Sequence, residues 1–173
     1  MTPEQAGACC YEHPRPALTV DIVLVHLGAD GRPRTLLIQR RHPPFEAQWA
    51  LPGGFVDKDE PLHAAALREL REETALQDLR LEQIGAFGEP GRDPRGWVVS
   101  VAFATYIPDF QGEIQAGDDA TKAAWWPVDA LPPLAFDHKR IIATALEALD
   151  FVPRAATNLA LSKDLRRDKT ELG

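Results

Sequence analysis

The sequence predicts an α+β fold in which helices cover the faces of a mixed β-sheet. Apolar runs typical of strands recur along the chain, and two segments with helical periodicity accompany them. The length of 173 residues suits one domain with a sizeable core. We predict a domain at residues 17–150, an irregular, proline-containing arm at residues 1–16, and a C-terminal tail at residues 151–173.

The predicted elements begin with a hairpin. Residues 18–27 (LTVDIVLVHL) and 34–40 (RTLLIQR) are typical of strands, and Asp30-Gly31 between them marks a turn. Residues 42–48 form a loop, and WALPGG at 49–54 a rigid turn. The later elements are a helix from Pro61, strands at 79–88 and 97–107, a loop at 108–121, a strand at 123–128 and an amphipathic helix at 136–149.

Composition excludes several classes of protein. The net charge of −7 argues against a nucleic-acid-binding surface, which would carry a basic stripe. The only cysteines, Cys9 and Cys10, are adjacent and poorly placed for a disulfide, which favours a reducing cytoplasm. Neither a signal peptide nor an apolar run long enough for a membrane helix is apparent. We expect a cytoplasmic protein with no membrane or nucleic-acid partner.

The acidic motif, residues 54–76, carries the strongest functional signal. On a helix, Glu69, Glu72 and Glu73 stand at positions i, i+3 and i+4, so their carboxylates crowd one face. Mg²⁺ typically takes one or two carboxylates and leaves its other positions to water and substrate phosphates. The alternative is a solvated helix in which Arg68 merely pairs with Glu72. The acidic motif specifies six positions, and a chance match to all six would occur in about one in ten million windows. This rarity favours the metal site over the solvated helix.

This spacing resembles the Nudix hydrolase signature, G-x5-E-x7-R-E-U-x-E-E-x-G-U, where U is aliphatic. The matching positions are Gly54, Glu60, Arg68, Glu69, Leu70, Glu72, Glu73 and Leu76. Ala75 replaces the family's second glycine, and an alanine forced to positive φ there costs about 1 kcal/mol. The helix is therefore expected to extend or to end differently. The resemblance implies a Nudix-type α/β/α sandwich.

The resemblance also implies a Mg²⁺- or Mn²⁺-dependent reaction. Glu72 and Glu73 are the expected principal ligands, and Glu69 a third ligand or the base that receives a proton from water. The carbonyl of Gly54 is expected to join the metal shell. Arg68 is expected to pair with Glu72 and hold its carboxylate in place.

Three further acidic residues are weaker candidates. Glu60 is either a ligand, a residue behind the ligands, or a charge favoured by the helix dipole. Asp118 and Asp119 match the place where family members often carry another acidic group, the alternative being a solvated turn. Lys122, where related segments often have glutamate, weakens the case for that loop.

Residues 88–97 (GEPGRDPRGW) resemble a segment of Nudix members that act on ADP-ribose, in which Pro90 is close to a proline that accompanies that specificity. Arg92 and Arg95 are expected to grip phosphate or the distal ribose, because guanidinium suits bidentate anion contacts. The alternative is a turn closed by internal salt bridges.

Other substrate contacts are expected from the residues that precede the acidic motif. The start of the last predicted helix is not expected to contact the substrate. Arg40 and Arg41 are candidate anion contacts, and Phe45 is a candidate for stacking on adenine. His138 and Lys139 begin the last predicted helix, where a solvated or capping role is expected.

The leading hypothesis is hydrolysis of a nucleoside diphosphate linked to another moiety, with ADP-ribose giving AMP and ribose 5-phosphate. A first alternative is hydrolysis of nucleoside triphosphates or another nucleotide sugar. A second is an ADP-ribose sensor without catalysis, as in Nudix regulators. Three features argue against a sensor: the acidic motif keeps its glutamates, few residues follow Asp150, and the chain has a net charge of −7. The resemblance also implies a homodimer, since the family often builds its site at a subunit interface.

Overall fold

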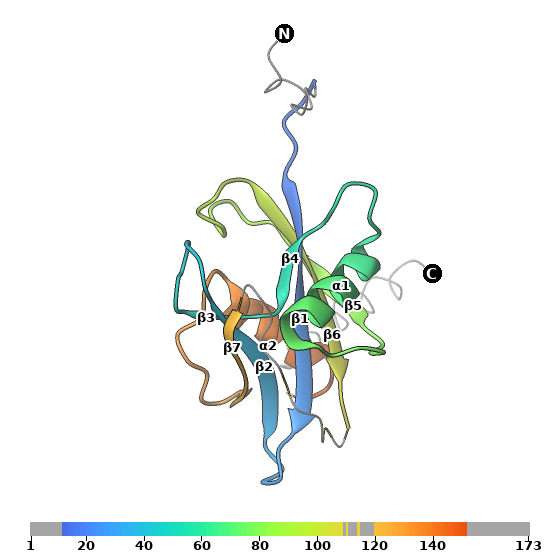
Figure 1. Cartoon of the computed structure of the whole chain (residues 1–173), viewed down its shortest axis with the longest axis vertical. Coiled ribbons are helices and arrows are strands. Elements are labelled where there is room, and N and C mark those ends of the chain that lie inside the picture. The colour runs from blue at the N-terminus through green and yellow to red at the C-terminus, as the bar shows by residue number, and fades with distance from the viewer. Residues whose placement is uncertain (1–11, 109, 111–113, 115–119, 152–173) are drawn as a thin grey trace, which may run out of the picture.

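The computed structural model describes residues 12–108, 110, 114 and 120–151. Within them, a seven-stranded sheet is combined with two helices (Figure 1). In chain order the elements are β1 (Ala17–Leu27), β2 (Pro33–Arg40), β3 (Trp49–Ala50), β4 (Gly53–Phe55), α1 (Leu62–Thr74), β5 (Glu82–Phe87), β6 (Val98–Tyr106), β7 (Ala120–Pro127) and α2 (His138–Ala148). In this part of the chain, neither helix has the length and apolar character needed to cross a membrane.

The sheet is mixed, as predicted. Its main path runs β3-β2-β1-β6-β5, with β4 paired to β1 and β7 paired to β2. β1 and β6 are parallel over residues 17–25 and 98–106, whereas the other pairings between the named strands are antiparallel. β1 therefore has neighbours along most of its length, and it forms the centre of the molecule.

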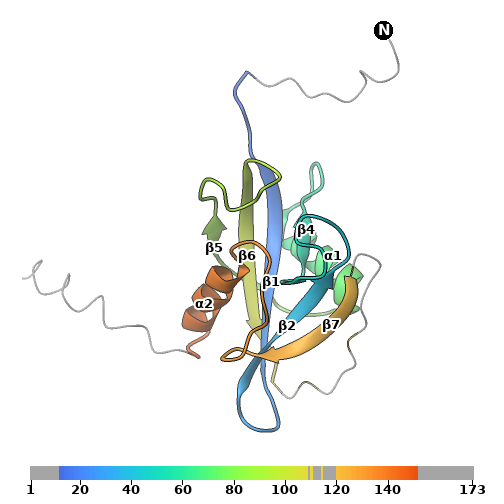
Figure 2. The ribbon, with the colours of Figure 1, turned by 90° about the vertical axis from the view of Figure 1, so that its left-hand side faces the viewer.

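The two helices cover opposite faces of this sheet (Figure 2). Side chains of β1 alternate between them: Val20, Ile22 and Leu24 join the core under α1, while Val23 and Val25 join the core under α2. Because both faces are covered, the strand is a continuous apolar run rather than an alternating one. The predicted α/β/α sandwich is confirmed.

The end of α1 shows how the chain accommodates the missing glycine. The helix ends at Thr74, and Ala75 adopts a left-handed conformation with φ of 60°. The Ala75 N–H donates to the carbonyl of Arg71 at 3.0 Å, closing the last turn. The prediction that the helix extends or ends differently was wrong: it ends where the signature places its glycine, at the conformational cost of an alanine in the left-handed region.

Most predicted elements are confirmed, including the β1–β2 hairpin and both helices. Three predictions were wrong in detail. The strand predicted at 79–88 is only the six-residue β5, and β7 begins at Ala120 instead of residue 123. The turn predicted at 49–54 contains β3 and the start of β4, because Gly53 and Gly54 pair with β1. Asp118 and Asp119 lie outside the described residues, as do Cys9 and Cys10.

Candidate functional site

An open cleft lies beside α1, along the segment that joins β3 to β4. Its volume is about 440 Å³, within the range of small-molecule sites. Seven of the predicted site residues line it: Arg40, Arg41, Gly54, Arg68, Glu69, Glu73 and Arg95. Carboxylates of α1 and guanidinium groups of β2 and of the segment 88–97 therefore share one cleft, although they are far apart in the sequence.

Arg68 organises the acidic side of the cleft. Its Nε and Nη2 each donate to the Glu60 carboxylate at 2.9 Å, and its Nη1 donates to Glu69 at 2.7 Å. Nη2 also donates to the carbonyl of Phe55 at 3.0 Å. The predicted contact with Glu72 exists, but at 3.3 Å it is the longest of these. One guanidinium thus ties three acidic side chains to the end of β4.

The arrangement explains the position of Glu60. Besides its paired contact with Arg68, its carboxylate accepts a hydrogen bond from the Asp57 N–H at 3.0 Å. The hydrogen bond from Arg68 lowers the pKa of Glu60 to about 2, so this group is anionic at neutral pH. Glu60 does not line the cleft. Its placement favours the second of the three predictions, a residue behind the proposed ligands.

Glu69 lies directly over Gly54. A Cβ on Gly54 would approach the Glu69 Oε1 to 2.4 Å, so a larger residue there would displace this carboxylate. Burial raises the pKa of Glu69, and the hydrogen bond from Arg68 opposes that shift. A partly desolvated carboxylate on a cleft wall is suited either to bind a cation or to accept a proton.

Glu73 is buried, with 8% of its surface exposed. Its Oε2 accepts a hydrogen bond from the Gly53 N–H at 2.8 Å. This bond links α1 to the first residue of β4. Glu72 differs, because its side chain is 51% exposed and it does not line the cleft.

The donors fit a hard divalent ion held by few protein ligands. Across the described residues, no three acidic, histidine or cysteine side chains converge closely enough to form a metal site by themselves. The cleft does offer the carboxylates of Glu69 and Glu73 and the backbone of Gly54. Mg²⁺ commonly binds through one or two carboxylates and completes its shell with water and phosphate oxygens. The cleft therefore suits an ion that is bound together with its substrate.

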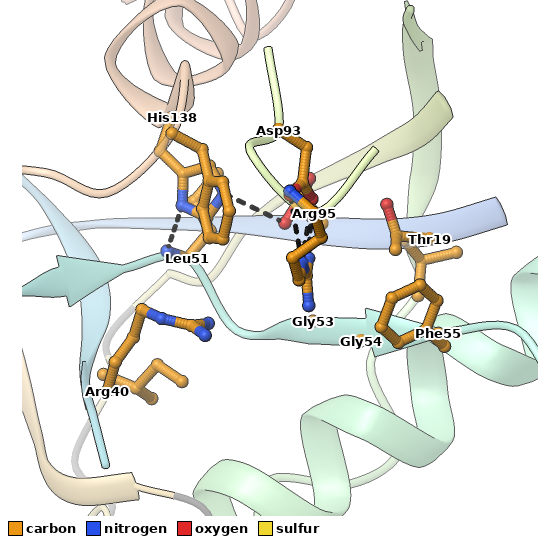
Figure 3. A pocket seen from close by; sticks show the side chains of 13 residues that line it. Thr19, Arg40, Leu51, Gly53, Gly54, Phe55, Asp93, Arg95 and His138 are labelled. Atoms are coloured by element: carbon orange, nitrogen blue, oxygen red, sulfur yellow. Dashed lines mark hydrogen bonds and ion pairs between the residues drawn. The ribbon is translucent and has the colours of Figure 1, made fainter. Parts of the chain in front are cut away.

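Arg40 and Arg95, which line the cleft, also line a smaller pocket that shares its wall (Figure 3). The Asp93 carboxylate fixes Arg95 by accepting hydrogen bonds from its Nε at 3.0 Å and its Nη2 at 2.7 Å. The Arg95 guanidinium carbon is 4.8 Å from the ring centre of Phe55 and 5.2 Å from that of Phe136. Arg40 stacks on Phe136 at 5.1 Å. Both cations are held in place before any ligand arrives.

Phe136 was missed because the sequence placed it inside the last helix. It instead precedes that helix with φ of 51° and lines the small pocket at the inner end of the cleft. Phe45, the predicted stacking residue, packs edge-on against Phe136 with ring centres 4.8 Å apart. Phe45 does not line the cleft, so its placement indicates a supporting contact.

Arg92 is not placed as a substrate contact. Its side chain is 4% exposed, and Nε donates to Asp137 at 3.0 Å while Nη2 lies 3.7 Å from Asp21. These contacts, together with the Asp93–Arg95 pair, close the segment 88–97 by internal salt bridges. For Arg92 the alternative prediction, a turn closed by internal salt bridges, is therefore the better description. Arg95, in contrast, reaches the cleft.

His138 is also placed differently from the expectation. It is 3% exposed instead of solvated. Its Nδ1 accepts a hydrogen bond from the Leu51 N–H at 2.8 Å, and its Nε2 lies 3.3 Å from Oδ1 of Asp21. The Ser100 hydroxyl donates to the other oxygen of Asp21. Asp21 and Ser100 lie on separate strands and Leu51 lies between β3 and β4, so no local sequence pattern predicted the cluster.

The buried His138 predicts a pH dependence of stability. Burial lowers its pKa, and the nearby Asp21 opposes that shift. A histidine that stays neutral when folded but gains a proton when unfolded contributes stability above the unfolded pKa of about 6.5, and this contribution is lost as the pH falls towards the folded pKa. Between pH 6.5 and 5.5, the loss should approach about 1.4 kcal/mol per pH unit. Urea denaturation of the metal-free protein and of His138→Asn measures the difference, and equal slopes would contradict it.

Comparisons with known proteins identify the family of the chain. The NUDIX domain model matches residues 16–145. The chain is 41% identical over 132 residues to an ADP-ribose pyrophosphatase of Methanocaldococcus jannaschii, covering 76% of this chain and 73% of that protein. It is 38% identical over 154 residues to an ADPR responsive transcriptional repressor of Acinetobacter baylyi, covering 85% of this chain. The match spans 61% of the repressor, less than two thirds of its length.

Solved structures of Nudix proteins have a similar fold. The NUDIX domain of Shewanella oneidensis NrtR, in complex with ADP ribose, is 35% identical and has a TM-score of 0.72, covering 86% of this chain and 99% of that chain. A MutT/nudix family protein of Enterococcus faecalis is 34% identical with a TM-score of 0.74, covering 83% of this chain and 66% of that chain.

Proposed function

The chain belongs to the NUDIX domain family and is a Nudix hydrolase, and from this premise we propose that it hydrolyses the diphosphate bond of ADP-ribose to give AMP and ribose 5-phosphate. One observation carries the proposal: the carboxylates of Glu69 and Glu73 and the guanidinium groups of Arg40 and Arg95 line the same cleft. A diphosphate needs cations on both sides, and a bound metal would supply the side that has only carboxylates.

Nudix hydrolases generally need a divalent metal, and Mg²⁺ or Mn²⁺ is the ion proposed here. Glu69 and Glu73 would hold it together with the carbonyl of Gly54. The more exposed Glu72 of α1 would be a further ligand. Bound there, the ion neutralises phosphate charge and lowers the pKa of a bound water. For Glu69 the second role, acceptance of the proton from the attacking water, is supported by the burial that raises its pKa.

The substrate would be held mainly by the arginines. Arg95 and Arg40 are fixed by Asp93 and by the carbonyl of Pro44, respectively, so their donors are positioned in advance. Arg41 lines the outer cleft and is retained as an anion contact. Arg92 and Phe45 are not retained, because their side chains are engaged elsewhere.

Three further features belong to this proposal. The protein is proposed to act in the cytoplasm, which the two adjacent cysteines favour. A homodimer is proposed, with residues 17–150 as the catalytic domain. No nucleic-acid partner is proposed, because the net charge of −7 opposes a polyanion.

Turnover with Mg²⁺ or Mn²⁺ tests the proposed function. ADP-ribose, ADP-glucose, NADH, diadenosine polyphosphates and nucleoside triphosphates are each incubated with the protein, and the products are separated by chromatography. AMP and ribose 5-phosphate as the main products, formed only with metal, are the expected result. Pyrophosphate released from triphosphates at a higher kcat/KM would instead assign the protein to triphosphate hydrolysis.

ADP-ribose sensing without catalysis is the second candidate. The similarity to a repressor that responds to ADPR favours it. A sensor would bind ADP-ribose, measured by calorimetry, and would show no metal-dependent turnover. Retention of Glu69, Glu72 and Glu73 supports hydrolysis instead.

Replacing Arg68 with lysine should reduce kcat about 10- to 100-fold, as is typical when a residue behind a metal site is lost. Lysine keeps the positive charge but cannot bind Glu60 with two parallel hydrogen bonds and reach Glu69 as well. The metal concentration for half-maximal rate should rise with the loss of kcat. Arg71→Lys, on the same helix, is the matched control, and equal kcat values in the two variants would contradict the assigned role.

A further inference from the structure

Behind the cleft, a buried polar cluster joins four segments of the chain. His138 comes from the start of α2, Asp21 from β1, and Arg92 from the segment 88–97, while the Leu51 N–H belongs to the connection between β3 and β4. Figure 3 shows His138 reaching Leu51 from above the pocket. The cluster lies on the α2 face of the sheet, whereas α1 and its carboxylates lie on the other.

The contacts define one tautomer of His138. Its Nδ1 accepts the Leu51 N–H and therefore carries no proton. Burial keeps the ring neutral, so the single proton must be on Nε2. Nε2 faces Oδ1 of Asp21 at 3.3 Å, and a carboxylate there favours this tautomer. Asp21 is held in turn by the Ser100 hydroxyl and lies near Arg92.

The segment that His138 holds leads straight to the cleft. The Leu51 N–H binds His138, and the Pro52 carbonyl accepts a hydrogen bond from the Ile22 N–H at 2.8 Å. The Gly53 N–H then donates to Glu73 at 2.8 Å, and Gly54 packs under Glu69. Of these four successive residues, the first two contact the core and the next two contact the two proposed ligands. A shift of Leu51 would be passed directly to both carboxylates.

We propose that His138 is a positioning residue for hydrolysis: through the Leu51 N–H it fixes residues 51–54, and so sets where the Gly54 carbonyl and the Glu69 and Glu73 carboxylates stand in the cleft. The inference rests on the proposed function. Asp21 sets the orientation of the imidazole, and Arg92 connects this cluster to the segment that carries Arg95. Arg92 thereby serves the site from behind the cleft.

The test compares His138→Leu with His138→Asn. Leucine removes the acceptor for the Leu51 N–H, while asparagine places an amide oxygen close to the position of Nδ1. His26→Leu is the matched control, because His26 is also buried and lies on β1 away from the cleft lining. Each variant is measured for kcat and KM with ADP-ribose, for Mn²⁺ binding by electron paramagnetic resonance, for the thermal midpoint, and for exchange of the Leu51 and Gly53 amides by NMR.

We expect His138→Leu to lower kcat about 10- to 100-fold, with weaker Mn²⁺ binding. KM should change less, and both amides should exchange faster. His138→Asn should recover part of each loss. His26→Leu should lower the thermal midpoint with kcat and amide exchange unchanged at a temperature where it is folded. Unchanged kcat in His138→Leu, no recovery in His138→Asn, or an equal loss in His26→Leu would each overturn the inference.

If His138→Leu does not fold, the ¹⁵N chemical shifts of the imidazole in the wild-type protein show which nitrogen carries the proton. A proton on Nε2 is the expected result, and a proton on Nδ1 would overturn the inference. Failure of the proposed function is distinct, because the wild-type protein would then not release AMP from ADP-ribose. In that case, Mn²⁺ binding and amide exchange still test whether His138 positions residues 51–54.

Discussion

Glu73→Gln is expected to lower the turnover of ADP-ribose by about 1000-fold or more while the protein stays folded. Glu73 supplies a buried anionic oxygen to the cleft, and its Oε2 already accepts the Gly53 N–H. Glutamine has nearly the same shape and keeps an amide oxygen for that hydrogen bond, so the link between α1 and β4 remains. It removes the negative charge. If the metal contributes several kcal/mol to stabilising the transition state, weakening its binding lowers the rate by about three orders of magnitude.

The measurement separates chemistry from folding. Initial rates are determined over a wide range of Mg²⁺ concentration, and the thermal midpoint is determined without metal. We expect kcat to fall, the metal requirement to rise, and the midpoint to change little. Glu82→Gln is the control, since Glu82 is an exposed glutamate of β5. Turnover in Glu73→Gln within tenfold of the wild type would rule out Glu73 as a principal ligand.

The local pattern of the acidic motif made much of this site predictable. Glu69 and Glu73 are four residues apart, so helix geometry alone places both on one side of α1. The central strand was equally clear, because a run such as residues 18–27 has few alternatives to a strand covered on both faces. Signals of this kind depend on neighbours in the sequence, and they do not require knowledge of the tertiary structure.

Other parts of the site depend on contacts between distant residues. Nothing near His138 in the sequence indicates that its acceptor faces Leu51 or that Asp21 lies beside it, because β1 and α2 meet only after folding. Arg92 and Arg95 are three residues apart and chemically equivalent, yet only Arg95 reaches the cleft while Arg92 is buried against Asp137. Composition cannot show which of two nearby arginines reaches the cleft, since the path of the loop sets the direction of each side chain.

Gly53→Ala should be the most destabilising substitution along the cleft, with a loss of about 4 kcal/mol in the free energy of unfolding. Gly53 has φ of 152°, and a Cβ there would come within 2.1 Å of the Val20 carbonyl oxygen. Positive φ costs a residue with a side chain about 1–3 kcal/mol, and overpacking in a core adds about 1–3 kcal/mol. Neither β4 nor β1 can move away easily, because the two strands are paired at this point.

Gly85→Ala separates these two costs. Gly85 has φ of 159°, close to that of Gly53, but a Cβ there would meet only the Phe87 ring at 3.8 Å. Urea denaturation should therefore show a loss of about 1–3 kcal/mol for Gly85→Ala and a clearly larger loss for Gly53→Ala. Because the Gly53 N–H holds Glu73, the alanine should also lower kcat in whatever fraction remains folded, whereas Gly85→Ala should leave kcat unchanged. Equal losses of stability in the two variants would mean that β4 can move away from β1, and that the position of Glu73 is set by α1 alone.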